Sequence, residues 1–519
     1  MLYLAFIFHM HQPYYKDLLT QETEIPWVRL HGIKDYLDMV QILDKYPSLH
    51  QTFNLVPCLI EQIEDYTQRT VKDKYLELSY KPTLELTEKE KAFLLDKFFS
   101  IDTRNCIAVH PRYYELYFKK QTKKEFTNQD YLDLQVWFNL AWTDPSFRNN
   151  IPELKNIVAK GRFFSEEEKH IVLDKQLIIL EETIPAYKKA ILTGQIEVSV
   201  SPYYHPILPL LYNTSLGKEA NPKTTLPNLQ FKYPQDAKEQ IDAAVTFYKD
   251  RFGKAPLGMW PSEESVCEHI LNFFIASGLN WIVTDEAILF KSLKTKKRDT
   301  KLLYQPYILK RKEGNLNIIF RDRHLSDLVG FVYHKWSAKD AAGDFLKQLE
   351  NIHKAFKDRD ILVTIAMDGE NAWEYYTNDG HDFLNELYSK LSEAKFLKAV
   401  TVSEYLNLFP AQNNIQRLSA GSWIYGEFGK WIGNPYKNKA WEWLAQARTE
   451  LQKLIDTNQD INNLIWKQMH ILEGSDWFWW YGEDHHGDFD KLFRMHLTNF
   501  YTLIGKGIPE YLKSPLTAK

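Results

Sequence analysis

The acidic residues best placed for chemistry stand at the ends of apolar runs or in proline-containing turns. Asp368 and Glu370 follow the apolar run ILVTIAM, and Glu263 and Glu264 follow Trp260 in the turn WPSEE. Carboxyl groups brought together from two such segments can act as nucleophile, general acid or general base. We expect one acid of the Glu263 and Glu264 pair to face a pocket and the other to face solvent.

Two imidazole groups follow the first apolar run, in FIFHMHQP at residues 6–13. His9 and His11 are two residues apart, so on a strand they face the same side. One interpretation is a core histidine followed by a turn residue before Pro13. Another is a pair of metal ligands, which would need carboxylate or histidine partners elsewhere in the chain.

Two further segments combine polar groups with aromatic rings. GQIEVSVSPYYHPILPL carries Glu197 on an expected strand and His205 between prolines, which suit a rigid loop. GSDWFWWYGEDHHGDFD places four consecutive aromatic residues, from Trp477 to Trp480, directly after Asp476. Four consecutive helical side chains cannot all face inward, so at least one ring should meet a ligand or another domain.

The elements that must position these groups are short β-rich runs separated by longer helical patterns. This alternation favours an α/β fold with a parallel sheet, open or closed. Polar residues follow several of the runs, as catalytic groups do at the carboxyl ends of strands in a (β/α) barrel. The expected strands are residues 2–8, 51–56, 196–200, 281–284, 317–321 and 361–366.

Two long stretches have helical patterning without strand signals. Residues from about 60 to 190 form a charged stretch too long for one crossover, which predicts a helical insertion. From about residue 405 the pattern predicts a C-terminal helical bundle. We therefore expect a catalytic barrel over 1–404 and a helical domain over 405–519 that contributes to the active-site cleft.

Composition narrows the class of partner and the compartment. A formal net charge of −4 and a pI near 6.5 give no basic surface for nucleic acid. No run approaches the roughly 20 apolar residues of a membrane span, and LYLAFIF reads as a first buried strand rather than a signal peptide. The three cysteines, Cys58, Cys106 and Cys267, lack metal-type spacing and suggest free thiols in the reducing cytoplasm. Nothing in the sequence predicts an oligomeric state.

Five motifs together resemble the ordered signature regions of glycoside hydrolase family 57. The resemblance implies a (β/α)7 barrel followed by a helical domain, acting on α-glucans with retention of configuration and without a metal or other cofactor. The forms GSDWFWWYG and PYYHPILPL are most similar to the amylopullulanase and α-amylase branches. The five motifs are HQP at 11–13, GQIEV at 194–198, WPSEE at 260–264, MDGENAWE at 367–374 and GSDWFWWYGED at 474–484.

By this resemblance Glu263 is the nucleophile and Asp368 the general acid/base, while His11 and Glu197 hold sugar hydroxyls. Retention requires the two catalytic carboxyls to lie about 5–5.5 Å apart. We expect hydrogen bonds to keep Glu263 ionised, and apolar surroundings to keep Asp368 protonated. We also expect Trp477 to stack on a sugar ring and Trp480 to be packing. The further residues expected to contact substrate are His9, Gln12, Trp27, His205, Trp260, Glu370, Trp373, Trp423 and Asp476.

The activity implied is hydrolysis of starch and maltooligosaccharides at α-1,4 bonds, and the resemblance also allows α-1,6 bonds and pullulan. An alternative is a 4-α-glucanotransferase or branching enzyme, which shares the covalent intermediate. A more distant alternative is a metal-dependent α-mannosidase or deacetylase, with zinc on His9, His11 and Asp368. The last is a glucan-binding protein without turnover.

Overall fold

The computed structural model describes the whole chain except residues 296, 460, 483–486 and 517–519. The polar end of the motif at 474–484, with Glu483 and Asp484, and the two histidines that follow it therefore lie outside the described residues.

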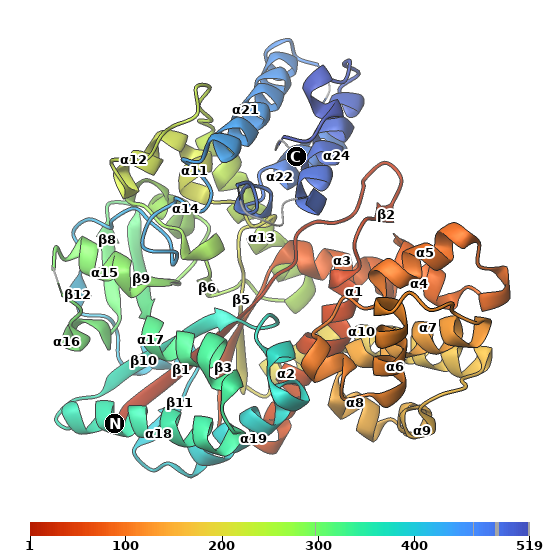
Figure 1. The fold of residues 1–519 in the computed structure, drawn as a ribbon. Helices are drawn as coiled ribbons and strands as arrows, with labels where there is room; N and C mark the ends of the chain where they lie inside the picture. The colour runs from red at the N-terminus through yellow and green to blue at the C-terminus, as the bar shows by residue number, and fades with distance from the viewer. Residues whose placement is uncertain (296, 460, 483–486, 517–519) are drawn as a thin grey trace.

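Parallel strands form a ring in the centre of the molecule (Figure 1). Hydrogen-bonded parallel pairs join β10 to β1, β1 to β3, β3 to β5, β6 to β7 and β7 to β9. A parallel bridge from Val200 to Met259 joins β5 to β6, and a 2.8 Å bond from the Asp322 amide to the Thr364 carbonyl joins β9 to β10. Among the described residues this closes a (β/α)7 barrel. Its strands are β1 (Leu2–Met10), β3 (Gln51–Leu55), β5 (Ile196–Ser199), β6 (Gly258–Met259), β7 (Trp281–Asp285), β9 (Gly314–Arg321) and β10 (Ile361–Asp368).

All six strands expected from the sequence are present within a few residues. The sequence did not indicate β6, which has only two residues, or β8 (Tyr307–Arg311), which pairs antiparallel with β9 outside the ring. β6 begins at Gly258, where a Cβ atom would stand 1.9 Å from the Trp281 ring. Only glycine fits there, and glycine gives little strand signal.

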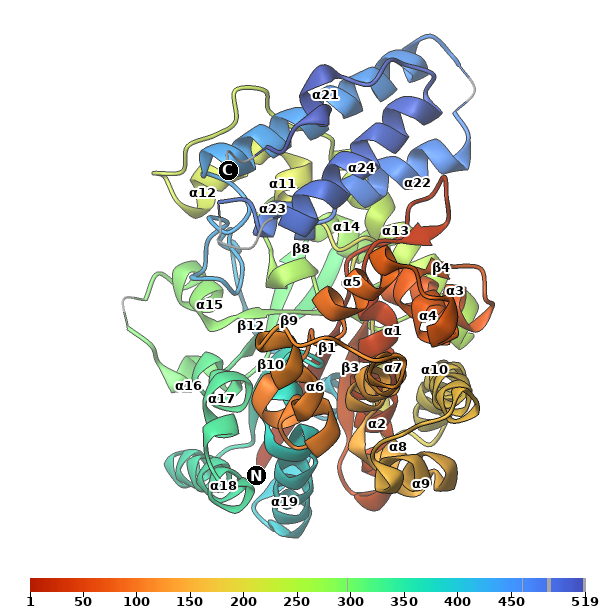
Figure 2. The same cartoon turned by 45° about the vertical axis from the view of Figure 1, so that its right-hand side comes forward.

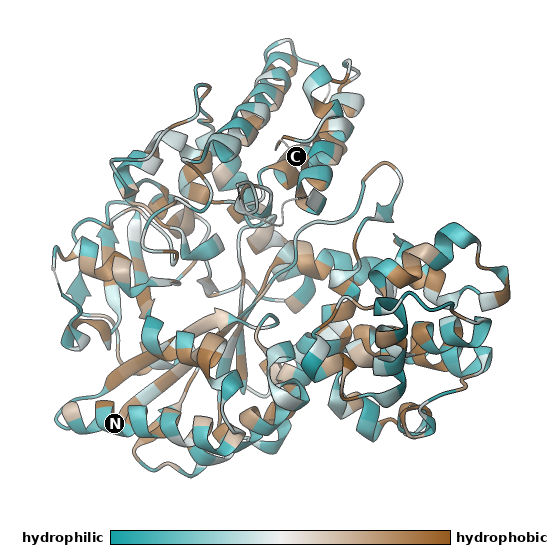
Figure 3. Ribbon diagram, in the orientation of Figure 1, coloured by the Kyte–Doolittle hydropathy of each residue, from teal (hydrophilic) through white to brown (hydrophobic). Residues whose placement is uncertain are grey.

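The barrel interior is apolar below its carboxyl-terminal end. Figure 3 shows β1 as largely hydrophobic, whereas the peripheral helices carry hydrophobic and hydrophilic faces in alternation. Burial of these side chains is the main force that holds the ring together. The interior cluster includes Ala5, Ile7, Trp260, Trp281, Val283, Ile319, Leu362 and Ala366.

Helices fill the chain between β3 and β5, and they group beside the barrel (Figures 1 and 2). Several start at capping boxes, such as Ser165 with Glu168 at the start of the longest helix, which satisfy the free amides of the first turn. These helices are α3 (Pro57–Thr67), α4 (Lys74–Tyr80), α5 (Glu88–Lys97), α6 (Pro111–Gln121), α7 (Asn128–Trp142), α8 (Pro145–Asn150), α9 (Pro152–Lys160) and α10 (Glu166–Leu192).

A second group of helices ends the chain. They pack on the segment between β5 and β6, where Arg448 pairs with Asp236 at 2.7 Å and Gln240 donates to the His470 carbonyl. The division into units at residue 404 stays a prediction. The helices of this group are α21 (Pro435–Asp456), α22 (Asn463–Leu472), α23 (Asp476–Trp479) and α24 (Gly487–Leu503).

The remaining helices cover the barrel or connect its strands. None of the described helices has the length and apolar character needed to cross a bilayer. They include α1 (Trp27–His31), α2 (Leu37–Gln41), α11 (Leu208–Tyr212), α13 (Pro234–Phe252), α14 (Leu271–Ala276), α15 (Glu286–Ser292), α17 (Arg323–Asp327), α18 (Ala338–Ala355), α19 (His381–Glu393) and α20 (Val402–Leu408).

Candidate active site

Asp368 is the last residue of β10 and lies in register with His9 of β1 at the carboxyl-terminal end of the barrel. The chain then turns across β1, where the Gly369 amide donates to the His9 carbonyl at 2.7 Å. A Cβ atom at Gly369 would stand 2.3 Å from the Met10 sulfur, so this crossing needs glycine. Asn371 Nδ2 donates to Asp368 Oδ2 at 3.1 Å. The turn therefore fixes the orientation of the Asp368 carboxyl.

Glu263 sits on a strained turn after β6. Its φ is +56° and that of Glu264 is +51°, a left-handed conformation that is unfavourable for side chains with a Cβ. Trp423 holds the turn from the opposite side, because its amide donates to the Glu263 carbonyl at 3.2 Å and its Nε1 donates to Glu263 Oε2 at 2.7 Å. Such strain is typical of functional positions, where the surrounding structure keeps an unusual conformation in place.

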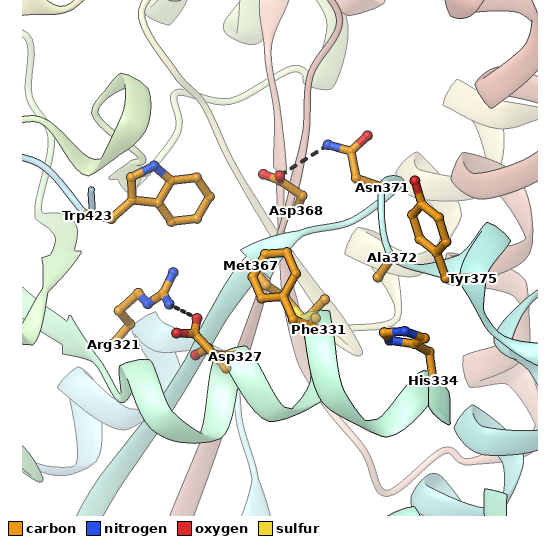
Figure 4. A pocket seen from close by; sticks show the side chains of 12 residues that line it. Arg321, Asp327, Phe331, His334, Met367, Asp368, Asn371, Ala372, Tyr375 and Trp423 are labelled. Atoms are coloured by element: carbon orange, nitrogen blue, oxygen red, sulfur yellow. Dashed lines mark hydrogen bonds and ion pairs between the residues drawn. The ribbon is translucent and has the colours of Figure 1, made fainter. Parts of the chain in front are cut away.

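A cavity of about 390 Å³ connects Trp423 to Asp368 (Figure 4). An ion pair of Arg321 and Asp327, at 2.6 Å, lies along one side, and Phe331 and Tyr375 line the other end with 71% and 51% of their surfaces exposed. Most of the cavity surface is apolar, and its acidic groups are Asp327 and Asp368. Its lining residues are Arg321, Ser326, Asp327, Gly330, Phe331, His334, Met367, Asp368, Asn371, Ala372, Tyr375 and Trp423.

Burial raises the pKa of both candidate catalytic carboxyls. The pKa of Asp368 rises through desolvation, which Asn371 and the His11 and Arg321 charges partly offset. Desolvation together with the Asp368 charge raises the pKa of Glu263 well above its usual range, and the Trp423 hydrogen bond lowers it only in part. The raised pKa of Asp368 agrees with the expectation of a protonated acid, whereas the raised pKa of Glu263 runs against the expectation that hydrogen bonds keep this carboxyl ionised.

Three histidines stack beside this pair at the mouth of the barrel. The ring centroids of His11 and His205 are 3.9 Å apart, and His9 lies 4.9 Å from His205 and 4.8 Å from Trp260. His9 Nδ1 bonds Asn54 Oδ1 at 2.6 Å. Burial and the His11 charge lower the pKa of His9 to about 3, so this imidazole is neutral. Burial and the other two histidines lower the pKa of His205 as well.

Acidic residues orient the end of this histidine group. Both carboxylate oxygens of Asp476 lie 3.1 Å from His11 Nε2, so α23 reaches the barrel mouth. Glu370 Oε1 accepts from the His11 amide at 3.0 Å and from Gln12 Nε2 at 3.3 Å. We call His9, His11, His205, Asp476 and Glu370 the histidine cluster.

Two described sets of side chains bring ligand atoms close enough for a metal ion. One is His11, His205 and Asp476 in the histidine cluster, and the other is Asp38, Asp144 and His381. The zinc set considered from the sequence was His9, His11 and Asp368. It is not among these sets, and His9 Nδ1 is bonded to Asn54.

The structure does not bring Glu197 to the cavity. Glu197 is the second residue of β5, and its carboxylate accepts from Trp281 Nε1 at 2.9 Å and from Ser403 N and Oγ at 2.9 and 2.6 Å. Trp281 begins β7, so these bonds lie toward the amino-terminal end of the barrel. The prediction that Glu197 holds a sugar hydroxyl is wrong, because its position on the strand places it too deep.

Two predicted tryptophans lie in cores instead of on the cavity wall. Trp477 is 1% exposed, donates to the Ile471 carbonyl at 2.7 Å and packs against Phe493 and His496. Trp373 is also 1% exposed and donates to the Gly369 carbonyl at 2.7 Å. Neither ring is available to stack on a sugar, so both assignments are wrong.

Trp27 also stays apart from the cavity. It begins α1, and its ring packs against Trp142 of α7 and against His31. The cavity lining does not include Trp27, so its assignment to substrate has no support in the structure. Trp260 is also fully buried and does not line the cavity; its ring packs against His9 and edge-on to Trp423, so it supports these two side chains.

Glu264 is fully buried rather than facing solvent, which corrects the sequence-based expectation. Both of its carboxylate oxygens lack a hydrogen-bond partner among the described residues. Burial raises its pKa well above the usual range, and the charges of Arg321 and Arg323 only partly offset this. The acid that reaches the Trp423 side is Glu263.

Sequence reasoning missed one whole wall of the cavity. Arg321 is the last residue of β9, so the strand-end rule that found Asp368 could have identified it. Its guanidinium lies over the Trp423 ring at 5.2 Å. Phe331, His334 and Tyr375 lie in ordinary helical or turn segments, and nothing in their spacing distinguishes them from surface residues.

The sequence and the fold of this chain are similar to those of several known proteins. An α-amylase of Dictyoglomus thermophilum is 24% identical over 313 residues, which are 58% of this chain and 38% of that relative. The structure of a GH57-type branching enzyme from Pyrococcus horikoshii aligns with a TM-score of 0.64 and 16% identity, over 96% of this chain and 89% of the other. The α-amylase AmyC of Thermotoga maritima aligns with a TM-score of 0.61 and 14% identity, over 98% and 95%.

These structural likenesses show the shared barrel fold. The family model described as glycosyl hydrolase family 57 matches residues 5–417, most of the chain. The chain belongs to glycosyl hydrolase family 57.

Proposed function

We propose that this chain is a retaining enzyme of α-glucans in which Glu263 is the nucleophile and Asp368 the general acid/base. The observation that carries the proposal is the link across the cavity. Trp423 donates to Glu263 Oε2 at 2.7 Å and lines the same cavity as Asp368. The Asp368 charge also acts on Glu263, so the two carboxyls are neighbours, as double displacement at a sugar carbon requires.

In the first step Glu263 attacks the anomeric carbon, and Asp368 gives its proton to the leaving oxygen. In the second step Asp368 takes a proton from the incoming hydroxyl, and the bond to Glu263 breaks. The cycle requires an ionised Glu263 and a protonated Asp368. Because burial raises the pKa of both groups, we infer that the pair shares a proton and that substrate binding shifts it to Asp368.

The histidine cluster is suited to hold the sugar on the other side of this pair. Neutral His9 and the Asp476-bound His11 offer planar hydrogen-bonding groups, and the Trp260 ring stacks on His9. We propose hydrolysis of α-1,4 bonds in starch and maltooligosaccharides as the main reaction, with α-1,6 bonds as a further substrate class.

One observation favours transfer as a second candidate. The cavity includes Asp368 but not Glu263, so it lies on the side of the general acid, where the leaving group departs and the acceptor arrives. Its exposed rings, Phe331 and Tyr375, suit the C–H faces of an acceptor sugar.

A cytoplasmic location also stays a prediction, and Cys58, Cys106 and Cys267 are free thiols in the structure.

A product profile on starch, pullulan and maltotriose tests the proposal, with Glu263→Gln protein as the matched control. Glucose and maltose alone from maltotriose indicate hydrolysis, and products longer than maltotriose indicate transfer. Release of maltotriose from pullulan adds α-1,6 cleavage, because α-1,4 cleavage of pullulan gives other products. If no product forms from any of the three, or if Glu263→Gln turns over normally, the proposal is wrong.

A further inference from the structure

A second polar cluster lies between the helical segment and the barrel, outside the cavity lining. Asp38 comes from α2, Asp144 precedes α8, and His381 begins α19. These elements neighbour one another in Figures 1 and 2. Asp38 is 5% exposed, Asp144 is fully buried and the His381 side chain is 13% exposed. One oxygen or nitrogen of each lies within 4.8 Å of the others.

The bonds of Asp144 present one oxygen to the centre of this cluster. Its Oδ1 accepts from the Ser146 amide at 2.7 Å as the N-cap of α8, and also from the Ser146 hydroxyl. Its Oδ2 meets His381 Nε2 at 2.7 Å. One oxygen of Asp144 is thus fixed to a helix start, as in an oriented metal ligand, and the other shares a proton with His381 that a bound ion would have to replace.

Asp38 supplies an independent observation. Its Oδ1 is buried and has no hydrogen-bond partner among the described residues. A buried carboxylate oxygen without a partner is unfavourable, so the fold needs either a proton or a cation beside it. Burial and the charges of Asp144 and Asp35 raise the pKa of Asp38, which reflects an excess of negative charge at this point.

The neighbouring cations are committed to other groups. Lys34 Nζ donates to Asp35 at 3.1 Å and to Asp379, and His31 Nδ1 pairs with Asp35 at 2.7 Å. Arg148 donates to His110 Nε2 at 2.8 Å, and its charge also acts on Asp144.

His381 bonds Asp144 directly and shares with Asp144 and Asp38 a set of ligand atoms within 4.8 Å of one another. An imidazole that gives up its shared proton becomes a neutral ligand, and the cluster then offers two carboxylates and one ring nitrogen.

We propose that Asp38, Asp144 and His381 bind a divalent transition-metal ion, with Zn²⁺ as the expected occupant. Zinc accepts mixed nitrogen and oxygen ligands, whereas Ca²⁺ and Mg²⁺ prefer oxygen alone. The ion would join α2 and α8 to α19, which follows the segment that carries Asp368. It is a structural clamp, and it does not depend on the function proposed above.

The test uses the full chain, stripped with EDTA and then titrated separately with Zn²⁺, Mn²⁺ and Ca²⁺. Metal content and Tm are measured for the wild type, Asp38→Asn and Asp476→Asn. We expect one equivalent of zinc and a zinc-dependent rise in Tm for the wild type. Asp38→Asn removes a ligand charge at constant shape, so zinc affinity should fall at least about 100-fold. Its metal-free Tm should stay equal or rise, because repulsion is relieved.

Asp476→Asn is the matched control, because it alters the other three-ligand set and should keep the zinc response. The proposal fails if Asp38→Asn binds zinc as the wild type does, if Asp476→Asn loses the ion, or if no metal changes the Tm of the wild type. A response to Mn²⁺ or Ca²⁺ without a response to Zn²⁺ overturns the assignment of the ion. His381→Gln is a second variant. If His381→Gln does not fold, Asp38→Asn still decides the test.

Discussion

The two sides of Asp368 are built from different kinds of residue. On one side the histidine cluster is buried and bonded within itself, with His11 held by Asp476 and Glu370. On the other side the cavity wall presents the exposed rings of Phe331 and Tyr375. A rigid polar side suits recognition of one fixed sugar, and an open apolar side suits varied leaving groups and acceptors. We therefore propose that the buried side orients the sugar and that the open side sets selectivity.

The largest effect should come from Glu263, the proposed partner of Asp368. Glu263→Ala removes the proposed nucleophile, so kcat should fall by at least about 10⁴-fold with the fold intact. Azide should fill the space and restore turnover, giving a β-configured glycosyl azide. If azide does not rescue Glu263→Ala and Glu264→Ala is the inactive variant, the nucleophile is Glu264. The interpretation of Glu264 as a buried residue outside the site would then be wrong.

Asp368→Ala tests which side holds the leaving group. Loss of a general acid slows substrates with poor leaving groups by roughly 10²–10⁴-fold. We expect such a loss in kcat/KM on maltooligosaccharides and a much smaller loss on activated aryl glycosides. Equal loss on both substrates would mean that Asp368 only supports the site. The cavity wall would then not be the leaving-group side.

The same contrast explains what the sequence could and could not predict. The parallel strands followed from periodicity, and their closure into a barrel followed from the family resemblance. His9, His11 and Asp368 were found because acids and histidines at strand ends are rare enough to be informative, and Asp476 was found in the motif GSDWFWWYG. The tryptophans were harder. Trp477 and Trp423 have the same residue type, yet one packs in a core and the other lines the cavity.

Depth along a strand was the second obstacle. Glu197 has the right chemistry but stands near the start of β5, and the motif does not say how far a side chain lies from the barrel mouth. Arg321 closes β9 and could have been included by the rule that was applied to β10. Phe331 becomes part of a wall only when α17 and the turn after it fold beside β10.

The variants Trp477→Ala and Trp480→Ala test whether these rings beside the histidine cluster only pack in the core or also bind substrate. Trp477→Ala should lower the free energy of unfolding by about 3–5 kcal/mol, because it opens a buried cavity next to Phe493 and His496. Trp480 is partly exposed and stacks on Phe489, so Trp480→Ala should have the smaller effect on Tm. Thermal melts compare the two. A Trp477→Ala protein with an unchanged Tm and weak glucan binding would return this ring to the substrate site.

Glu263→Gln should stabilise the protein at neutral pH. The raised pKa of Glu263 means that the folded state binds more protons than the unfolded state, so stability falls as pH rises above the unfolded pKa toward the folded one. Glutamine lacks this titration. The gain should be small near pH 4 and should grow as the pH rises toward 7. Melts across this range that show no growing difference would contradict the buried-charge account.

The smallest effect is expected on the open wall, and it decides what that wall does. Phe331→Ala and Tyr375→Ala should each raise KM for maltooligosaccharides about 3- to 10-fold, since an aromatic contact is worth about 0.5–1.5 kcal/mol. Because both rings are largely exposed, Tm should hardly change. Trp336→Ala is the control, as Trp336 is exposed in the same segment but does not line the cavity. If the wall binds an acceptor sugar, the two wall variants should also shift products of maltotriose from longer chains toward glucose and maltose. If all three variants behave alike, this wall is ordinary surface and selectivity belongs to the histidine cluster.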